Sequence, residues 1–291
     1  MYTFYIACSK EELKKKEVGL NLENYFISLF NSKSIGDDAA VINGQIYSKD
    51  AFFENVHFKR EWMSYEQIAK KAMLVNISDA VAMNAEPKYV LLSVAMPKDM
   101  SRDDMQALAQ GFKNVASYYK CDIVGGDTIS NTKLDITVTV VSKSKRPLYR
   151  KSIKNSYLLA YTGELGQSAK DLQKLFRGGK IHKQSKFVDI KLRQDFVKNA
   201  SRILKAGMDI SDGLFSDLEK ILKLNRLGVH FYDAISKNIG CSGEEYEMLV
   251  AFDGRDKKAV LRRAAQSRTR LTIFGKASRK RYINRCKAHH F

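Results

Sequence analysis

The sequence lacks the marks of several common protein classes. Its 291 residues include only four cysteines, and no two of them have the paired spacing of a zinc or redox motif: Cys8, Cys121, Cys241 and Cys286. We interpret all four as free thiols in a reducing cytoplasm. No apolar run approaches the length of a membrane span, and the first eight residues do not follow the pattern of a signal peptide.

The signatures of two nucleotide-binding folds are also missing. The chain has no Gly-x-x-x-x-Gly-Lys-Ser/Thr loop and no set of protein-kinase motifs, which excludes both of those folds. The turn from Thr162 to Ser168 has glycines spaced so that it could receive a phosphate, although turns of this kind are common. We find no internal repeat and no low-complexity segment.

Acidic residues are scarce relative to basic ones. The 50 lysines and arginines exceed the 32 acids and give a formal net charge of +18, and after Arg255 the only acid is Asp256. Such a balance can mark a nucleic-acid-binding protein. We favour a solvated basic surface that attracts anionic nucleotides, and we expect no specific nucleic acid partner.

At 291 residues the chain is long enough for one large domain or two of ordinary size, and its hydrophobic fraction of 44% is enough for real cores. Serines and lysines cluster around Arg146-Pro147, and we place a domain boundary there. It separates an N-terminal domain of residues 1–145 from a C-terminal domain of residues 146–291. Strands mix with long helices in the first half, so the expected fold class is α+β.

Local signals predict individual elements. Asn43-Gly44 indicates a tight hairpin, and Ser64 and Ser101 each begin a helix with a capping box. Apolar periodicity predicts further helices over 22–30 and 212–224. Strand patterns occupy the following segments: 90–96, 134–140, 157–161 and 229–232.

Aspartates recur among apolar or very small residues. They lie in four kinds of setting, after a glycine, at the end of an apolar run, inside an apolar helix and around Ser211: Asp37, Asp38, Asp50, Asp79, Asp127, Asp209 and Asp212. Each alone could belong to an ordinary turn or helix cap. Because a buried, unpaired carboxylate is costly, acids in such settings usually pair or bind a metal, and Mg²⁺ prefers oxygen ligands. Together they indicate one shared metal site.

These motifs resemble, in order and spacing, those of thiamine-monophosphate kinase, a family in the superfamily of aminoimidazole-ribonucleotide synthase and selenophosphate synthetase. The resemblance begins near residue 23 and reaches the end of the chain. It rests on these segments: Gly36–Ala40, Asp50 with Glu54–Phe58, Asn76–Asp79, Gly125–Thr128, Asp209–Gly213 and Ser242–Glu247.

The resemblance implies a cytoplasmic enzyme that uses ATP and several Mg²⁺ ions to convert thiamine monophosphate to thiamine diphosphate. It also implies two α/β domains of the aminoimidazole-ribonucleotide-synthase type, with mixed sheets packed with helices. A homodimer is implied as well, in which the first domains of the two copies pair their sheets. We expect no membrane partner.

The resemblance further implies a role for each matching residue. Magnesium ligands would be Asp38, Ser48, Asp50, Asp79, Asp127, Asp209 and Asp212. ATP would contact Gly126, Asp127, Arg150 and Ser211, and thiamine monophosphate would contact His57 and Glu244. No side chain would act as acid, base or nucleophile, because phosphoryl transfer depends on positioning and charge neutralisation.

The chain departs from the family pattern at several positions. Lys49 replaces a threonine beside the first metal ligands, where its ammonium could repel the ion or point away. Asn55 and Asn84 replace glycines, and Ala288 replaces the aromatic ring expected to stack on the substrate. Residues 178–200 lack the usual segment rich in arginine and proline. Lys49 and Ala288 leave open the alternative of a degenerate, inactive family member.

Two further alternatives remain. Another ATP-using member of the superfamily would share the acidic motifs, although a selenophosphate synthetase would place a cysteine in a glycine-rich N-terminal segment, and Cys8 lies in none. A basic nucleic-acid-binding protein is the alternative of a different class, and it would not require clustered acids.

Overall fold

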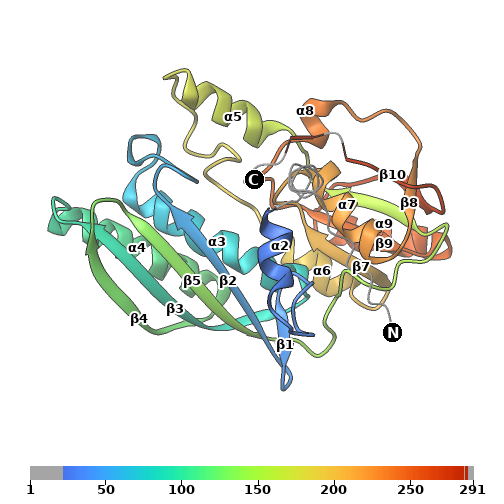
Figure 1. The fold of residues 1–291 in the computed structure, drawn as a ribbon, viewed down its shortest axis with the longest axis horizontal. Helices are drawn as coiled ribbons and strands as arrows, with labels where there is room; N and C mark the ends of the chain where they lie inside the picture. Colours follow the sequence, from blue (N-terminus) through green and yellow to red (C-terminus); the bar gives the residue numbers. More distant parts are fainter. Residues whose placement is uncertain (1–21, 285, 288–291) are drawn as a thin grey trace, which may run out of the picture. The chain divides into compact units, whose positions relative to one another are not determined.

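The computed structural model describes residues 22–284, 286 and 287. Ser34–Lys287 form one compact unit, whereas the helix α2 (Leu22–Ser28) belongs to a separate one. The helix expected over 22–30 is therefore present, two residues shorter than predicted. Within the compact unit the chain builds two five-stranded sheets with helices against them (Figure 1).

The first sheet has the strand order β1-β2-β5-β3-β4. Its strands are β1 (Ala40–Ile42), β2 (Gln45–Phe53), β3 (Glu86–Pro97), β4 (Asp122–Asn131) and β5 (Asp135–Lys143). Only β3 and β4 run parallel, and the other neighbours are antiparallel. Asn43 and Gly44 join β1 to β2, both with positive φ, as a two-residue hairpin of mirror-image type requires.

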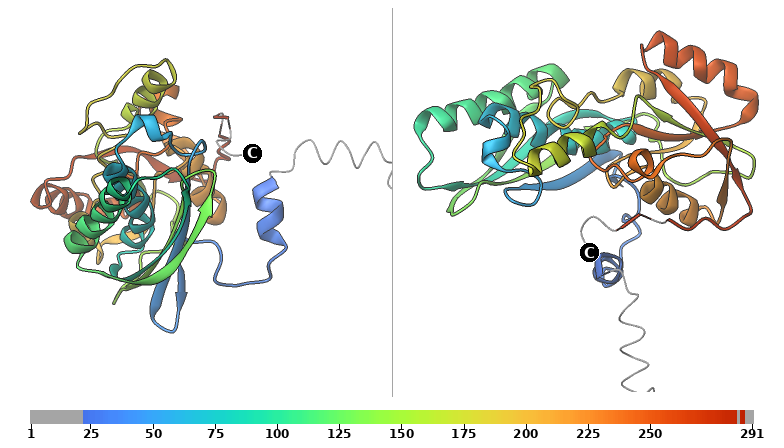
Figure 2. Two further views of the ribbon diagram at one scale, coloured as in Figure 1. Left: turned by 90° about the vertical axis from the view of Figure 1, so that its left-hand side faces the viewer. Right: turned by 90° about the horizontal axis from the view of Figure 1, so that it is seen from above.

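Two long helices cover one face of this sheet, α3 (Tyr65–Ala82) and α4 (Arg102–Tyr119), as the two views of Figure 2 show. Both begin with the predicted capping boxes, formed by Ser64 with Gln67 and by Ser101 with Asp104. Most of α3 is buried, which makes it the central helix of the molecule. The opposite face of the sheet carries exposed apolar side chains such as Tyr89 and Leu91.

The second sheet has the order β7-β9-β6-β10-β8, and all its neighbours are antiparallel. Its strands are β6 (Leu158–Thr162), β7 (Leu204–Asp209), β8 (Gly228–Phe231), β9 (Met248–Phe252) and β10 (Leu271–Ser278). The remaining helices are η1 (Arg60–Trp62), α5 (Gln167–Phe176), α6 (Gln194–Ala200), α7 (Leu214–Leu224), α8 (Lys237–Gly240), η2 (Gly254–Asp256) and α9 (Lys257–Gln266).

The core runs through both sheets. One cluster joins α3 and the first sheet to one face of the second, where Val250 and Phe252 point. On the other face, Leu249 and Ala251 pack against α7. The strand β9 is therefore buried on both faces, which explains why its sequence is continuously apolar. The first sheet ends at Lys143 and the second begins at Leu158, while the division into domains at 145/146 stays a prediction.

The free-thiol interpretation is wrong for two cysteines. Cys241 and Cys286 form a disulfide across a Cα–Cα distance of 5.6 Å, because the fold brings together segments 45 residues apart. Cys121 is a free, buried thiol, as expected, and Cys8 lies outside the described residues. Sequence spacing could not reveal this pair, since a disulfide depends on distance in space.

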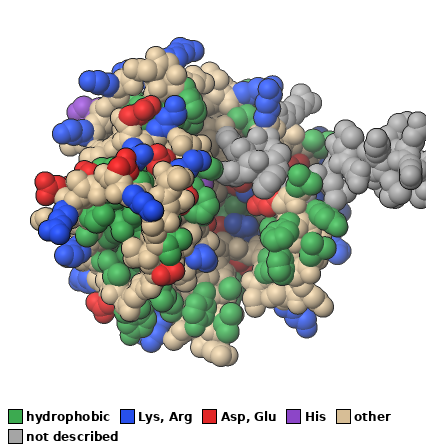
Figure 3. Space-filling model, turned by 60° about the vertical axis from the view of Figure 1, so that its left-hand side comes forward, with side chains coloured by type: hydrophobic (Ala, Val, Ile, Leu, Met, Phe, Trp, Pro, Cys, Tyr) green, Lys and Arg blue, Asp and Glu red, His purple; other side chains and the backbone are tan. Residues whose placement is uncertain are grey.

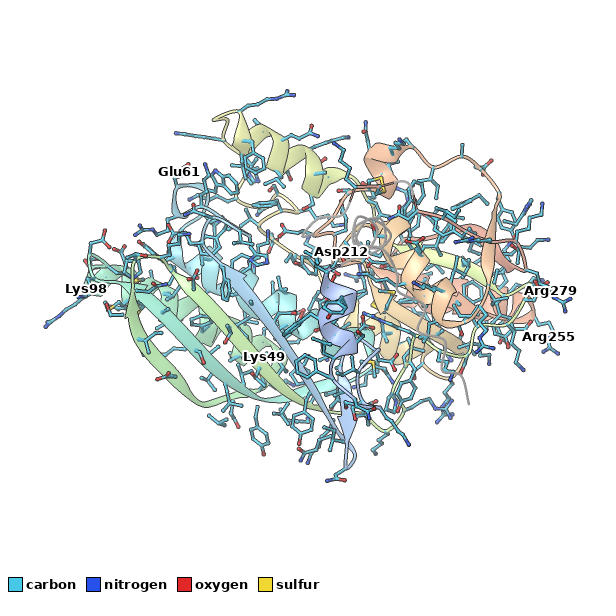
Figure 4. The ribbon with its side chains drawn as sticks, viewed as in Figure 1. Lys49, Glu61, Lys98, Asp212, Arg255 and Arg279 are labelled. Carbon is cyan, nitrogen blue, oxygen red and sulfur yellow. A yellow bond between two sulfur atoms is a disulfide. The ribbon has the colours of Figure 1, made fainter. Side chains whose placement is uncertain are left out.

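The basic C-terminal part is folded. Along α9, Val260 and Ala264 are buried while the neighbouring basic side chains are exposed. Arg255 and Arg279 lie at the end of the molecule away from Asp212 (Figure 4). On the face shown in Figure 3, lysines and arginines are dispersed among acidic and apolar residues and form no continuous patch. Within the described residues, no helix combines the length and the apolarity needed to cross a membrane.

Candidate active site

Three aspartates from distant parts of the chain converge where the two sheets meet α3. Asp38 lies in the turn before β1, Asp79 near the end of α3, and Asp209 at the end of β7. One carboxylate oxygen from each lies within 4.8 Å of the others. We call these three residues the acidic cluster. The sequence predicted all three as metal ligands.

Polar residues of α3 hold the surrounding elements in place. The Asn76 side-chain oxygen accepts a hydrogen bond from Asp50 N at 2.7 Å, and its carbonyl accepts one from Ser48 Oγ at 3.2 Å. One turn further, Ser78 Oγ donates to Asp209 Oδ2 at 2.7 Å. A single helix thereby fixes β2 and β7 beside Asp79.

Burial and mutual repulsion disfavour the charged form of these acids. Burial raises the pKa of Asp38 to about 7, with a further increase from Asp209. Burial and the charge of Asp209 raise the pKa of Asp50 to about 6. The pKa values of Asp79 and Asp209 are also raised, mainly by burial. Without a cation, these carboxylates therefore destabilise one another.

One arginine compensates part of this charge. Arg150 Nη2 donates to Asp38 Oδ1 at 2.5 Å, and the Arg150 backbone N–H donates to Asp37 Oδ1 at 2.6 Å. The Asp38 side chain is fully buried, yet its Oδ2 atom has no hydrogen-bond partner among the described residues. A buried carboxylate oxygen without a donor, beside two further acids, fits a hard divalent cation.

Two other predicted metal ligands lie differently. The Asp212 carboxylate forms an ion pair with Lys220 at 2.5 Å, and Lys220 also contacts the buried Asp217 at 2.9 Å. Asp127 lies on β4, where it is exposed. The assignments of Asp212 and Asp127 to metal stay predictions.

The sheet register gives the position of Asp127. It pairs with Ser93 on β3, and Ser93 pairs with Thr137 on β5. Thr137 in turn pairs with Ala51 on β2, next to Asp50. Three strand spacings separate Asp127 from Ala51, roughly 14 Å along the sheet. Gly126 is required beside it, because a Cβ there would lie 1.6 Å from the Leu92 carbonyl oxygen.

The segment before β9 continues the ladder with the end of β7. Glu244 N donates to Ser211 O at 2.7 Å, and Tyr246 N donates to Ile210 O at 2.8 Å. The predicted substrate residue Glu244 therefore lies beside the predicted ATP residue Ser211. Burial raises the pKa of the Tyr246 hydroxyl well above its usual value, with contributions from the charges of Glu244 and Asp50. Tyr246 thus lies near both Glu244 and Asp50.

The second predicted substrate residue, His57, follows β2. Its Nδ1 accepts a hydrogen bond from Phe53 N at 3.0 Å, which puts the proton of a neutral imidazole on Nε2. The ring of Phe52 stacks on His57 with 5.6 Å between centroids. Phe52 also lies 5.8 Å from the ammonium of Lys71, which is paired with Glu244. His57 and Glu244 are thus connected by a chain of contacts through the Phe52 ring and Lys71.

The Lys49 side chain points away from Asp50. Its Nζ donates to Thr137 Oγ1 at 3.2 Å and to Thr139 Oγ1 at 3.4 Å, on the uncovered face of the first sheet (Figure 4). Asn55 and Asn84 both have positive φ, a conformation that asparagine tolerates better than most residues, so they suit positions where glycine is usual. Ala288 lies outside the described residues.

The turn from Thr162 to Ser168 is occupied by the protein itself. Gly166 N donates to Glu245 Oε1 at 2.7 Å, and Ala169 N donates to Ser242 Oγ at 3.2 Å. These N–H groups already have acceptors, which argues against phosphate binding at this turn.

A cavity of about 580 Å³ lies elsewhere, between Trp62 and the loop that contains Gly178, and no predicted site residue lines it.

Residues 36–143 match the family model described as AIR synthase related protein, N-terminal domain. The thiamine-monophosphate kinase of Bacillus subtilis is 32% identical over 218 residues, which cover 69% of this chain and 67% of the relative. The chain belongs to the thiamine-monophosphate kinase family. It is therefore a kinase of the superfamily that the motifs predicted.

Other members of this family agree. The thiamine-monophosphate kinase of Aquifex aeolicus is 29% identical over 243 residues, covering 80% of this chain and 78% of that protein. The structure of AaThiL complexed with AMPPCP and TMP superposes with a TM-score of 0.82 at 23% identity. It covers 99% of this chain and 100% of that one, and at this identity it supports the fold alone.

Sequence reasoning gave no role to several residues of this site. Asn76 and Ser78 were quoted only as parts of a motif, although they hold β2 and Asp209. Lys71 was overlooked, even though a lysine among Ile68, Ala72 and Val75 on the buried face of a helix is an available signal. Asp37 was included among the recurring aspartates but received no individual role, although it accepts a hydrogen bond from Arg150 N.

Proposed function

We propose that this protein transfers the terminal phosphoryl group of ATP to thiamine monophosphate with the help of Mg²⁺, producing thiamine diphosphate and ADP. The bond between the γ-phosphorus and the β,γ-bridging oxygen breaks, and a bond forms to a phosphate oxygen of thiamine monophosphate. The observation that carries the proposal is the convergence of Asp38, Asp79 and Asp209 around an unpartnered buried oxygen. We place the reaction in the cytoplasm, where ATP is available.

The acidic cluster and Asp50 would hold the magnesium. When bound, Mg²⁺ would neutralise the charge of the reacting phosphates and keep them in line. Arg150 holds Asp38 in place and can offer guanidinium donors to phosphate oxygens. Gly126, Asp127, Ser211 and Asp212 would act on ATP and further ions, as the family motif implies.

The test is direct. We expect thiamine diphosphate and ADP to form when the purified protein is incubated with ATP, thiamine monophosphate and Mg²⁺. Chromatography measures both products. A chelator should stop the reaction, and excess Mg²⁺ should restore it. Asp103→Asn, at an exposed position on the first turn of α4, is the matched control and should keep full activity. Absence of product at high protein concentration would favour the degenerate alternative.

We also infer that the protein is a homodimer that pairs the uncovered faces of its first sheets. The face opposite α3 and α4 exposes Tyr89 and Leu91, and Val124 and Ile129 of β4 are exposed by more than half. Exposed apolar strands of this kind need a cover in solution. Light scattering during gel filtration should give twice the chain mass, and Leu91→Lys should lower it. A wild-type monomer at micromolar concentration would contradict this inference.

A further inference from the structure

Lys71 is a charged residue buried in the central helix. Its side chain is 0% exposed, and its Nζ lies 2.9 Å from Glu244 Oε2. The same nitrogen lies 3.4 Å from the centroid of the Phe187 ring and 5.8 Å from that of Phe52. One carboxylate and two ring faces thus surround an ammonium that water does not reach. Burying a lysine costs stability, so its retention needs a reason.

Only one carboxylate oxygen of Glu244, the partner of Lys71, is engaged by the lysine. The Glu244 side chain is 24% exposed, and no described residue donates a hydrogen bond to its Oε1. The backbone of Glu244 has φ +54°, a conformation in which non-glycine residues are uncommon and which is often found at functional sites. In a purely structural pair, such as Arg193 with Glu247, both carboxylate oxygens have donors. Glu244 instead presents one oxygen outward.

The charge of the pair decides what that oxygen selects. A lone carboxylate attracts cations, whereas a carboxylate neutralised by an ammonium at 2.9 Å has little net charge and selects by hydrogen-bond direction. Thiamine monophosphate has a cationic thiazolium ring and a neutral pyrimidine with an amino group. The outward oxygen of a neutralised pair suits the amino N–H donor. The Phe52 ring, which lies 5.8 Å from the Lys71 ammonium, also stacks on His57.

Building on the proposed function, we propose that Lys71 is a positioning residue that neutralises and orients Glu244, so that Glu244 Oε1 accepts a hydrogen bond from the pyrimidine amino group of thiamine monophosphate. The pair then acts as a specificity device for the neutral half of the substrate.

The experiment measures binding and turnover of two ligands. One is thiamine monophosphate, and the other is its analogue with a carbonyl oxygen in place of the pyrimidine amino group. The variants are Lys71→Met, Lys71→Arg and Glu244→Gln, with Lys70→Met as matched control. Lys70 precedes Lys71 on α3 and pairs with Asp189 near the same loop, but 42% of its side chain is exposed.

Wild type should bind the amino ligand at least about tenfold more tightly than the carbonyl analogue, because two facing acceptors replace a donor and an acceptor. Lys71→Met should raise the KM for thiamine monophosphate about tenfold and reduce this discrimination, with the KM for ATP unchanged. Lys71→Arg should restore much of the discrimination, and Lys70→Met should resemble wild type.

Two results would overturn the proposal. The first is unchanged discrimination in Lys71→Met, including the case in which the affinities for both ligands fall equally, which indicates a packing effect only. The second applies if Lys71→Met does not fold: Glu244→Gln, which keeps the shape, would then retain the discrimination of wild type. Failure of the proposed function looks different, since wild type would form no product while calorimetry still reports whether it discriminates between the ligands.

Discussion

Two groups of buried carboxylates, the pair of Glu245 and Glu247 and the acidic cluster, have opposite electrostatics. Glu247 is almost fully buried and accepts hydrogen bonds from Arg193 at 2.7 Å and from Thr162 at 2.6 Å, with Lys186 at 3.1 Å. Burial alone would raise its pKa, but the hydrogen bond and charge of Arg193 and the charge of Lys186 lower it. Asp209 reaches the acidic cluster, where the pKa values are raised.

This difference distinguishes carboxylates that stabilise the fold from carboxylates that form a functional site. In the pair of Glu245 and Glu247, the chain supplies its own cations, because Lys186 also lies 2.9 Å from Glu245. In the acidic cluster, three carboxylates share Arg150 as their main cation. Asp38 Oδ2 and Glu245 Oε2 both lack a hydrogen-bond donor among the described residues, but Glu245 Oε2 lies 2.9 Å from the Lys186 ammonium. Burial alone therefore does not mark a site. A group of buried acids that the chain leaves short of cations does.

The largest expected effect is that of Asp79→Asn. The substitution should lower kcat about a hundred- to thousandfold, because it removes an oxygen ligand from the reacting centre. It should not destabilise the metal-free protein, since it removes one of several repelling charges. Steady-state kinetics and thermal melting without Mg²⁺ check both parts. A destabilised but active variant would place Asp79 with the structural carboxylates.

Glu247→Gln should show the reverse pattern. Breaking this pair leaves the partly buried Arg193, whose side chain is 21% exposed, without its full charge partner. The loss should be about 3 kcal/mol of unfolding free energy, the lower end for a buried pair. Urea denaturation measures this loss, and the folded fraction should still bind ATP. If Glu247→Gln were as stable as wild type, the contrast between the two groups would lose its basis.

The pH dependence of stability should follow the acidic cluster. Its folded pKa values, about 7 for Asp38 and about 6 for Asp50, lie above those of an unfolded chain. The folded state then binds more protons between about pH 4 and pH 7, so stability falls as pH rises through that window. The Tm without metal should be lower at pH 8 than at pH 5.5, and Mg²⁺-ATP should raise it more at pH 8. A flat profile in wild type would contradict the raised pKa values.

The smallest effect is expected for Lys49→Thr. The ammonium points to Thr137 and Thr139 on the uncovered face, so restoring the usual family residue should change activity by less than about twofold. The concentration of Mg²⁺ for half-maximal activity should also stay constant. A large gain in activity would mean that Lys49 opposes metal binding after all.

Much of the fold could be predicted from local signals. The Asn43-Gly44 hairpin and both capping boxes depend on neighbours in sequence, and all three are confirmed. The convergence of Asp38, Asp79 and Asp209 could be predicted because each lies among apolar or very small residues, where an unpaired carboxylate is costly to bury. The motif could not show how far apart its residues lie across the sheet. Within one chain, three strand spacings separate Asp127 on β4 from β2 beside the acidic cluster.

Other features escaped because they depend on contacts between distant segments. The bond between Cys241 and Cys286 and the contact between Lys71 and Glu244 each join residues far apart in sequence. The acceptors that fill the turn at Gly166 come from the segment before β9. Periodicity describes one element at a time, and none of these contacts lies within one element.

The most direct test of the central claim is to locate the metal. Crystals grown with Mn²⁺ in place of Mg²⁺ and a non-hydrolysable ATP analogue would reveal the ion by its anomalous scattering. We predict a peak within coordination distance of Asp38, Asp79 and Asp209, next to the Asp38 oxygen that has no partner in the metal-free protein. A fully occupied nucleotide with no peak among these three carboxylates would contradict the account.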